Sequence, residues 1–177
     1  MASYRIVDID ESVKPDILCA AEKLTLSDES VDTIFSIETL EHVENEEATI
    51  NEMRRVLRKG GRVILTIPFI APFHGANVGT DFGMSKADYR RYTAPGLLKL
   101  FERHGFKIVE VGPYIGVWGT LAETIKFFFI DPTRGEQHSW LRTKVAKAAI
   151  RFFQYLEERH PSSNQNFYSG SYVVAEK

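Results

Sequence analysis

Residues 31–68 have the sequence VDTIFSIETLEHVENEEATINEMRRVLRKGGRVILTIP, and this stretch decides the fold. Its first and last seven residues are mostly apolar, as expected of strands that are covered on both faces. Between these runs, Asn45 is a predicted helix N-cap, and Gly60 stands where a C-cap glycine belongs. A strand, a helix and a strand in this order predict a βαβ unit. The sheet should therefore be parallel in its centre.

The flanking sequence continues the alternation of strands and helices. It predicts strands at 4–10, 15–19, 106–111 and 171–175, and helices at 93–105 and 116–160. This alternation is typical of the α/β class. We expect one domain over residues 1–177, with a core at 1–115, a helical insertion at 116–160 and a final strand at 171–176.

Composition excludes several classes of protein. The chain has 177 residues, 44% of them hydrophobic, and a net charge of −2, which disfavour a disordered chain and a nucleic-acid-coating protein. A lone cysteine, Cys19, excludes an internal disulfide and fits a reducing compartment. The longest apolar run, 63–73, is shorter than the roughly 20 residues that a spanning helix needs. The sequence therefore predicts a cytoplasmic protein.

Three segments in order resemble the class I methyltransferases that depend on S-adenosylmethionine (SAM), of the type 11 kind. They are LTLSDESVDTI at 24–34, ETLEHV at 38–43 and RRVLRKGGRV at 54–63. The resemblance implies an incomplete Rossmann-like sheet, mostly parallel, with a helical insertion before the last strand. A narrower likeness, carried by Pro68, His74 and DYRRYT at 88–93, points to methyltransferases found among cell-surface glycan genes.

One part of the family pattern has no counterpart in this sequence. Family members open with a strand, a glycine-rich turn and a helix that cradle the methionine end of SAM. Here the first glycine is Gly60. Close backbone approach to a ligand requires glycine, because a Cβ would intrude. We therefore expect SAM binding by the isolated chain to be weak or absent.

The resemblance also implies residues that bind the cofactor. Asp8 would accept hydrogen bonds from the ribose hydroxyls, with Asp10 as a competitor for this role. Ala21 and Leu24 would pack on the adenine, or else belong to the core. Glu38 and His42 would share a helix face on the sulfonium side, unless His42 caps or packs locally. No metal site is expected, because only two ligands are in sight.

A long segment, 69–92, follows the strand that ends at Pro68. Within it, His74 and Asp88 are candidate catalytic bases, and Tyr89, Arg91 and Tyr92 are candidate substrate-binding residues. Loops of this length are usually lids or binding loops. The alternative is a mobile surface loop held by Arg–Asp pairs.

Two functions follow from these patterns. The first is methyl transfer from SAM to an oxygen or nitrogen of a small-molecule or glycan-type acceptor. The second is a catalytically inactive, truncated methyltransferase-like domain that oligomerises or binds a partner. We expect a homodimer and no nucleic acid. The basic segment 141–160 predicts contact with an anionic membrane, a cap over the sheet or a dimer helix.

Overall fold

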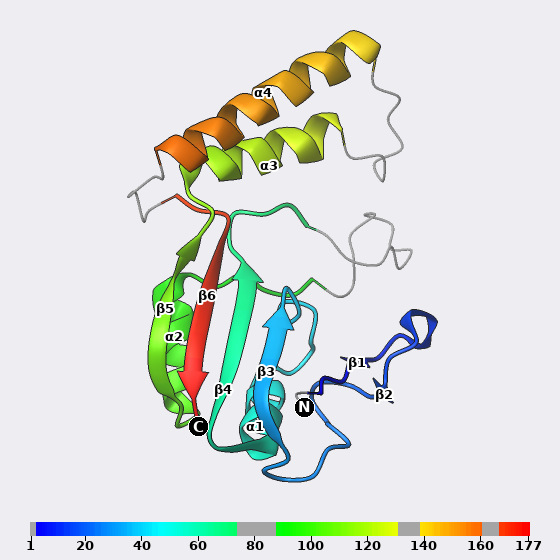
Figure 1. Cartoon of the computed structure of the whole chain (residues 1–177), viewed down its shortest axis with the longest axis vertical. Coiled ribbons are helices and arrows are strands. Elements are labelled where there is room, and N and C mark those ends of the chain that lie inside the picture. The colour runs from blue at the N-terminus through cyan, green and yellow to red at the C-terminus, as the bar shows by residue number, and fades with distance from the viewer. Residues whose placement is uncertain (1–2, 74–87, 131–138, 161–166) are drawn as a thin grey trace.

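The structure is a computed structural model that describes residues 3–73, 88–130, 139–160 and 167–177 (Figure 1). Its elements, in chain order, are β1 (Val7–Asp8), a short 3-10 helix (Glu11–Val13), β2 (Ile17–Leu18), β3 (Val31–Ile37), α1 (Glu46–Val56), β4 (Leu57–Pro68), α2 (Ala94–Arg103), β5 (Lys107–Tyr114), α3 (Val117–Phe129), α4 (Trp140–Arg159) and β6 (Gly170–Glu176). Strands alternate with helices, and the predicted α/β class is confirmed.

Four strands form the main sheet in the order β3-β4-β6-β5. β3 and β4 are parallel, as the βαβ pattern predicted. The central pair, β4 and β6, is antiparallel, and so is the pair of β5 and β6; the expectation of a sheet that is parallel in its centre is therefore wrong. β3, β4 and β5 therefore point in one direction, and their carboxyl ends meet at one edge of the sheet. Ligands of open α/β sheets bind at this edge.

Helix α1 begins as its sequence predicts. The side chain of Asn45 accepts a hydrogen bond from the backbone N–H of Ala48 at 3.0 Å. Its end is different, because β4 starts at Leu57 and Gly60 lies inside that strand with a φ of 75°. The predicted C-cap role of Gly60 is thus wrong: the glycine serves an irregular stretch of β4, where Val31 pairs with Leu57 and Thr33 with Arg62.

The two faces of the main sheet are covered unequally. Helices α1 and α2 pack on one face, over Val63, Leu65, Ile67 and Val173, all fully buried. No helix of the described residues lies against the opposite face, which is turned toward the viewer in Figure 1. There Phe35 is 70% exposed and Ile37 54% exposed. The expectation that residues 31–37 are covered on both faces is therefore wrong, since only one face has a helical layer.

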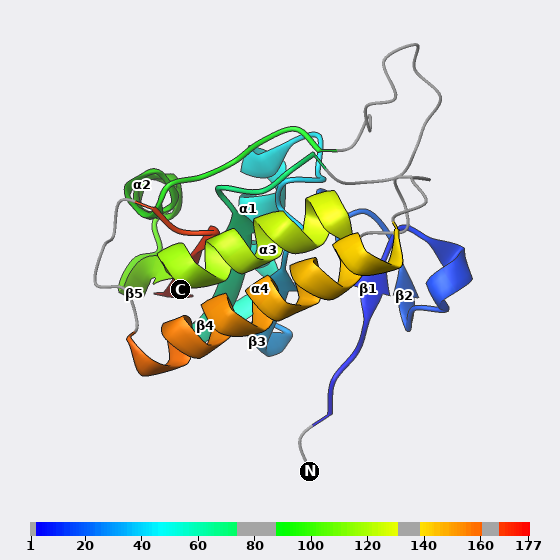
Figure 2. The same ribbon diagram turned by 90° about the horizontal axis from the view of Figure 1, so that it is seen from above.

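Strands β1 and β2 form a separate two-stranded parallel sheet. Each has only two residues, although the sequence predicted runs of five to seven. Both lie beyond the β3 edge of the main sheet (Figures 1 and 2). Within the described residues, β1 does not pair with β3, so the strand predicted at 4–10 runs outside the main sheet.

Helices α3 and α4 pack against each other as a hairpin beyond the carboxyl edge of the sheet (Figure 1). Their bounds fall inside the predicted helical segment 116–160. None of the helices in the described parts of the chain is both long and apolar enough to cross a membrane.

Candidate functional site

The carboxyl edge of the main sheet holds a hydrogen-bonded pair from two distant strands. The hydroxyl of Tyr114, the last residue of β5, donates to Oε1 of Glu38 at 2.6 Å. Glu38 directly follows β3, and its backbone N–H donates to the carbonyl and the hydroxyl of Thr66, both at 3.2 Å. The pair therefore links the two outer strands across β4 and β6.

A glycine makes this link possible. Gly170, the first residue of β6, lies so close to Tyr114 that a Cβ there would come within 2.4 Å of the phenol ring. The ring of Tyr114 thus packs directly over the backbone of β6 on its way to Glu38. Any side chain at Gly170 would displace it.

Backbone strain accompanies the pair. Glu38 has a φ of 49°, and Ile115, which follows Tyr114, has a φ of 54°. Residues other than glycine rarely adopt this left-handed conformation, and a β-branched residue does so least readily. Such strain persists where the surrounding structure enforces it, commonly at functional sites.

Burial and charge keep the phenol of Tyr114 in its neutral, donating form. Burial is the largest cause that raises its pKa well above the usual value of 10, and the hydrogen bond to Glu38 adds to it. A phenolate would face both Glu38 and the buried carboxylate of Glu41. Tyr114 therefore acts as a hydrogen-bond donor to Glu38 over the physiological pH range.

Residues 39–43 form a turn, not the helix on which Glu38 and His42 were predicted to share a face. The N–H of His42 donates to the carbonyl of Thr39 at 3.0 Å. Glu41 is fully buried, and its carboxylate lies 3.6 Å from Nε2 of His42. The carbonyl of Glu41 accepts from the N–H of Tyr89 at 2.8 Å, which joins this turn to segment 88–93.

Asp88 and Arg91 form a bidentate ion pair. Nη2 of Arg91 donates to Oδ2 of Asp88 at 2.8 Å, and Nη1 donates to Oδ1. This pairing is the largest cause that raises the pKa of Arg91, and the charges of Glu41 and Glu38 raise it further. Asp88 is almost fully buried. In this arrangement, the Asp88 carboxylate holds Arg91 in place beside two other acids.

The neighbours of this pair anchor the segment to α1. Arg90 donates to the carbonyls of Leu40 and Glu44, both at 3.1 Å, and pairs with Glu46. The hydroxyl of Tyr92 donates to Oε1 of Glu46 at 2.6 Å; burial first, and this bond second, raise its pKa to about 12. Segment 88–92 is therefore tied to the edge of the sheet through the first turn of α1.

The predicted cofactor residues of the N-terminal region lie elsewhere. Asp8 ends β1, and its Oδ1 accepts the N–H of Asp10 at 2.9 Å. Ala21 packs against the hydrophobic core. The N–H of Leu24 donates to Glu52 at 2.8 Å, and its carbonyl accepts from Arg55 at 2.9 Å, so this segment is fastened to α1.

The structure thus brings Glu38, His42, Asp88 and Arg91 to one edge, with Tyr89 and Tyr92 beside them. His74 lies outside the described residues. Sequence reasoning missed Tyr114 and Glu41. Tyr114 left no signal, because the strand was predicted to end at residue 111 whereas β5 continues to Tyr114. Glu41 is an acid between apolar Leu40 and Val43. Roles at this edge remain predictions.

The residues of this chain fit only part of SAM, the cofactor that the resemblance implies. Asp8 offers a half-exposed carboxylate at the end of β1, which suits a ribose. No glycine precedes Gly60, and β1 and β3 belong to different sheets. The residues present therefore fit the ribose end of SAM and not its methionine end. Among the described residues, no group of three or more His, Cys, Asp and Glu is placed to hold a metal ion.

Comparisons with known proteins agree with this picture. Residues 5–65 match the family model described as a methyltransferase domain. No curated protein sequence matches the chain. The matched segment comprises 61 of the 177 residues.

Solved structures share the fold at low identity. The [4+2]-cyclase SpnF is 18% identical with a TM-score of 0.51, over 90% of this chain and 55% of that one. Phosphoethanolamine N-methyltransferase 2 of Haemonchus contortus, in complex with SAM, is 14% identical with a TM-score of 0.50, over 90% and 36%. A SAM-dependent methyltransferase of Archaeoglobus fulgidus is 17% identical with a TM-score of 0.51, over 97% and 74%.

The chain thus spans 55% and 36% of the length of the first two of these proteins. One of the three is named as a cyclase, so the shared fold alone does not specify methyl transfer. With the family match over residues 5–65 and the shared fold, the resemblance of this chain to the class I methyltransferase family is confirmed.

Proposed function

We propose that this chain takes part in SAM-dependent methyl transfer to an oxygen or nitrogen of a small-molecule or glycan-type acceptor, and that it supplies the acceptor side of the site. The observation that carries the proposal is the Tyr114–Glu38 pair at the carboxyl edge, beside the Arg91–Asp88 pair. Ligands of open α/β sheets bind at this edge. The family match over residues 5–65 supports the same chemistry.

The residues at this edge have complementary tasks in the proposal. Oε1 of Glu38 is engaged by Tyr114, and Oε2 has no hydrogen bond within the described residues. Oε2 therefore suits an acceptor hydroxyl or amine that donates a hydrogen bond. Methyl transfer depends mainly on positioning the acceptor atom in line with the methyl group. Both carboxylate oxygens of Asp88 accept hydrogen bonds from Arg91, so proton removal falls to His74, the other candidate base. The Arg91–Asp88 pair orients the acceptor together with Tyr89 and Tyr92.

Calorimetric titration of the chain with SAM and with its demethylated product tests the cofactor side. We expect a dissociation constant in the high micromolar range, because the lost backbone contacts cost roughly 3–5 kcal/mol, or about two to four decades. Asp8→Ala should weaken binding about tenfold, whereas Asp10→Ala should not. Absence of binding at millimolar ligand would contradict the proposal. Sub-micromolar binding would contradict the partial fit.

A methyl-transfer assay with labelled SAM and a panel of hydroxyl and amine acceptors tests the acceptor side. Glu38→Gln should lower the rate at least tenfold, and Tyr114→Phe less, because it removes only the hydrogen bond that orients Glu38. Glu44→Gln, an exposed acid of the next turn, is the matched control. Equal rates for Glu38→Gln and the control would contradict the role of Glu38.

A second candidate function is a subunit that is completed by pairing, which we propose on a separate observation. The uncovered face of the main sheet exposes Phe35 and Ile37, and β3 is an edge strand within the described residues. Edges and apolar faces of this kind are commonly closed by another chain. We expect a homodimer through this surface.

Light scattering tests the pairing. The wild-type chain should have a mass near twice 20.2 kDa, and Phe35→Ser should return it to the monomer mass. Tyr4→Ser is the control. It also removes exposed apolar surface, but Tyr4 lies outside the main sheet. A monomeric wild-type chain would contradict the homodimer.

A further inference from the structure

Specific contacts hold helices α3 and α4 together as a hairpin. Oε1 and Oε2 of Glu157, in the last turns of α4, accept the N–H groups of Gly116 and Gly119 at 2.8 and 3.0 Å. These bonds cap the first turn of α3, which has no cap from its own N-cap residue. The rings of Trp118 and Phe153 stack with centroids 6.1 Å apart. The orientation of α4 on α3 is therefore set by specific contacts.

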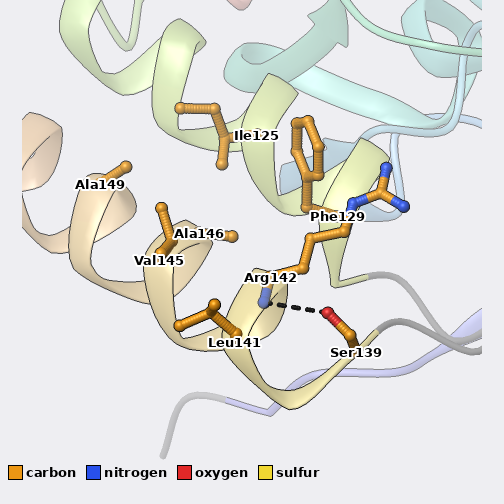
Figure 3. A pocket seen from close by; sticks show the side chains of 8 residues that line it. All are labelled: Ile125, Phe129, Ser139, Leu141, Arg142, Val145, Ala146 and Ala149. Carbon is orange, nitrogen blue, oxygen red and sulfur yellow. Dashed lines mark hydrogen bonds between the residues drawn. The ribbon is translucent and has the colours of Figure 1, made fainter.

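Helix α4 is apolar on two faces, and only one of them meets α3. Ala146 is its one buried residue among those described, and it faces α3 (Figure 3). Apolar side chains at i, i+4, i+11 and i+14 lie on a different face: Leu141, Val145, Phe152 and Tyr155. They are between 52% and 63% exposed. Figure 1 shows α4 farther from the sheet than α3. This second face, the outer stripe, is mainly exposed to solvent.

A hollow at the hairpin tip extends the apolar surface. It measures about 420 Å³, and Ile125 and Phe129 of α3 face Val145 and Ala146 of α4 across it (Figure 3). Leu141 and Val145 belong to both the hollow and the outer stripe. The exposed apolar surface of α4 is therefore continuous with the interior of the hairpin.

Cations border the outer stripe, and acids are absent there. Lys144, Lys147 and Arg151 follow one another at i, i+3 and i+7, along one side of the stripe. The described residues 139–156 contain no Asp or Glu. Nζ of Lys144 lies 4.7 Å from the ring centroid of exposed Trp140. Two acids follow this stretch in the last turn of α4: Glu157, which caps α3, and Glu158, which is exposed.

We propose that the outer stripe of α4 and its cation row dock on an anionic lipid membrane, with the helix lying in the plane of the surface. An amphipathic helix with Lys and Arg beside Trp, Phe and Leu binds in this way. Trp140 and Tyr155, near the two ends of the stripe, are of the types that collect at membrane interfaces. The proposal is independent of the proposed function.

Charge favours a membrane over a second copy of this chain on the stripe. An antiparallel two-fold pairing of two α4 helices sets the cation row of one copy beside that of the other. Like charges placed together at an interface oppose its formation. An anionic lipid surface instead attracts every cation of the row, and the flat outer side of a single helix matches a plane.

Vesicle co-sedimentation of the full chain tests the proposal. Vesicles of phosphatidylcholine with about a third phosphatidylglycerol should bind the chain, and pure phosphatidylcholine should not. The triple variant K144E/K147E/R151E should weaken partitioning at least a hundredfold, since each cation contributes roughly fivefold. The variant V145S/F152S should weaken it about tenfold or more at constant charge, because it removes apolar surface from the lipid.

The matched control is K23E/K59E/K107E, which changes net charge equally at exposed cations away from the hairpin. It should bind nearly as well as the wild type. Circular dichroism verifies that every variant is folded. If both triple variants lose vesicle binding equally, net charge alone explains the binding, and the proposal is overturned. Absence of vesicle binding together with a dimer that V145S/F152S dissociates would also overturn it, since a second copy would then cover the stripe.

Discussion

The two faces of the main sheet differ although their residue types are similar. In β4, Val63, Leu65 and Ile67 point to the side of α1 and α2 and are fully buried, whereas Ile64, between them, is only half-buried. On β3 the uncovered face exposes Phe35 and Ile37. Aliphatic residues on both faces are typical of a sheet with two helical layers. The apolar residues of the uncovered face therefore indicate a contact surface.

Adjacent residues of β4 give the largest expected difference between the faces. Leu65→Ala opens a cavity beneath α1 and α2 and should cost about 2–5 kcal/mol of unfolding free energy. Ile64→Ala, on the uncovered face, should cost less than half as much, because its side chain already contacts solvent. Urea unfolding of both variants measures the difference. Equal losses would show that another layer covers the second face in solution.

The hairpin lies beyond the end of the sheet and covers neither face. We therefore expect a substitution in the hairpin to change its local stability and leave the stability of the sheet unchanged. Glu157→Ala removes the cap of α3 and should cost about 1–2 kcal/mol in local stability. Hydrogen exchange should accelerate at the amides of Gly116, Gly119 and Thr120 and stay unchanged in β4. Glu158→Ala, an exposed neighbour, is the control. Faster exchange throughout β4 would show that the hairpin supports the sheet.

The smallest expected effect is on stability at low pH, and it concerns only the face of the sheet that α1 and α2 cover. Glu52 of α1 accepts hydrogen bonds from Arg55 and from the N–H of Leu24, and the bond from Arg55 is the largest cause that lowers its pKa. The resulting stability is complete above about pH 4.5, the usual value of the unfolded group, and is lost as the pH falls through the lower folded pKa.

Glu52→Gln should therefore flatten the acid side of the stability profile, by less than about 1 kcal/mol for a pair at the surface. Chemical unfolding at a series of pH values between 6 and roughly 3 measures it. Glu123→Gln, at an ion pair of the hairpin, is the matched change. An unaltered acid slope in Glu52→Gln would contradict the contribution of this carboxylate.

Local signals predicted the helix starts well. Asn45 caps α1, and Thr93 caps α2 by accepting the N–H of Gly96 at 3.2 Å. The end of α1 was missed because residues 54–59 are good helix formers, and only pairing with Val31 turns Leu57 into a strand residue. The strand predicted at 4–10 shrank for a related reason: its length depends on which neighbours it pairs with, and propensity does not encode that.

The candidate site was predicted in part. Glu38 follows directly from its place after a strand, since the carboxyl ends of parallel strands converge. The partner of Glu38 was not predictable in this way, because Tyr114 is 76 residues away and reaches it only over the bare backbone of Gly170. The burial of Glu41 likewise depends on segment 88–92, which packs over the turn from a distant part of the chain.

The position of β6 has a consequence for how this chain is made. In the main sheet β6 lies between β4 and β5 and pairs with both. Arg62 of β4 donates a hydrogen bond to Glu176 of β6, which is 114 residues away in the chain. A chain emerging from the ribosome therefore holds β4 with an unpaired edge until residues 170–176 appear. At 5–20 residues per second this interval lasts about 5–20 s. Until then, β5 has no strand of the main sheet with which to pair.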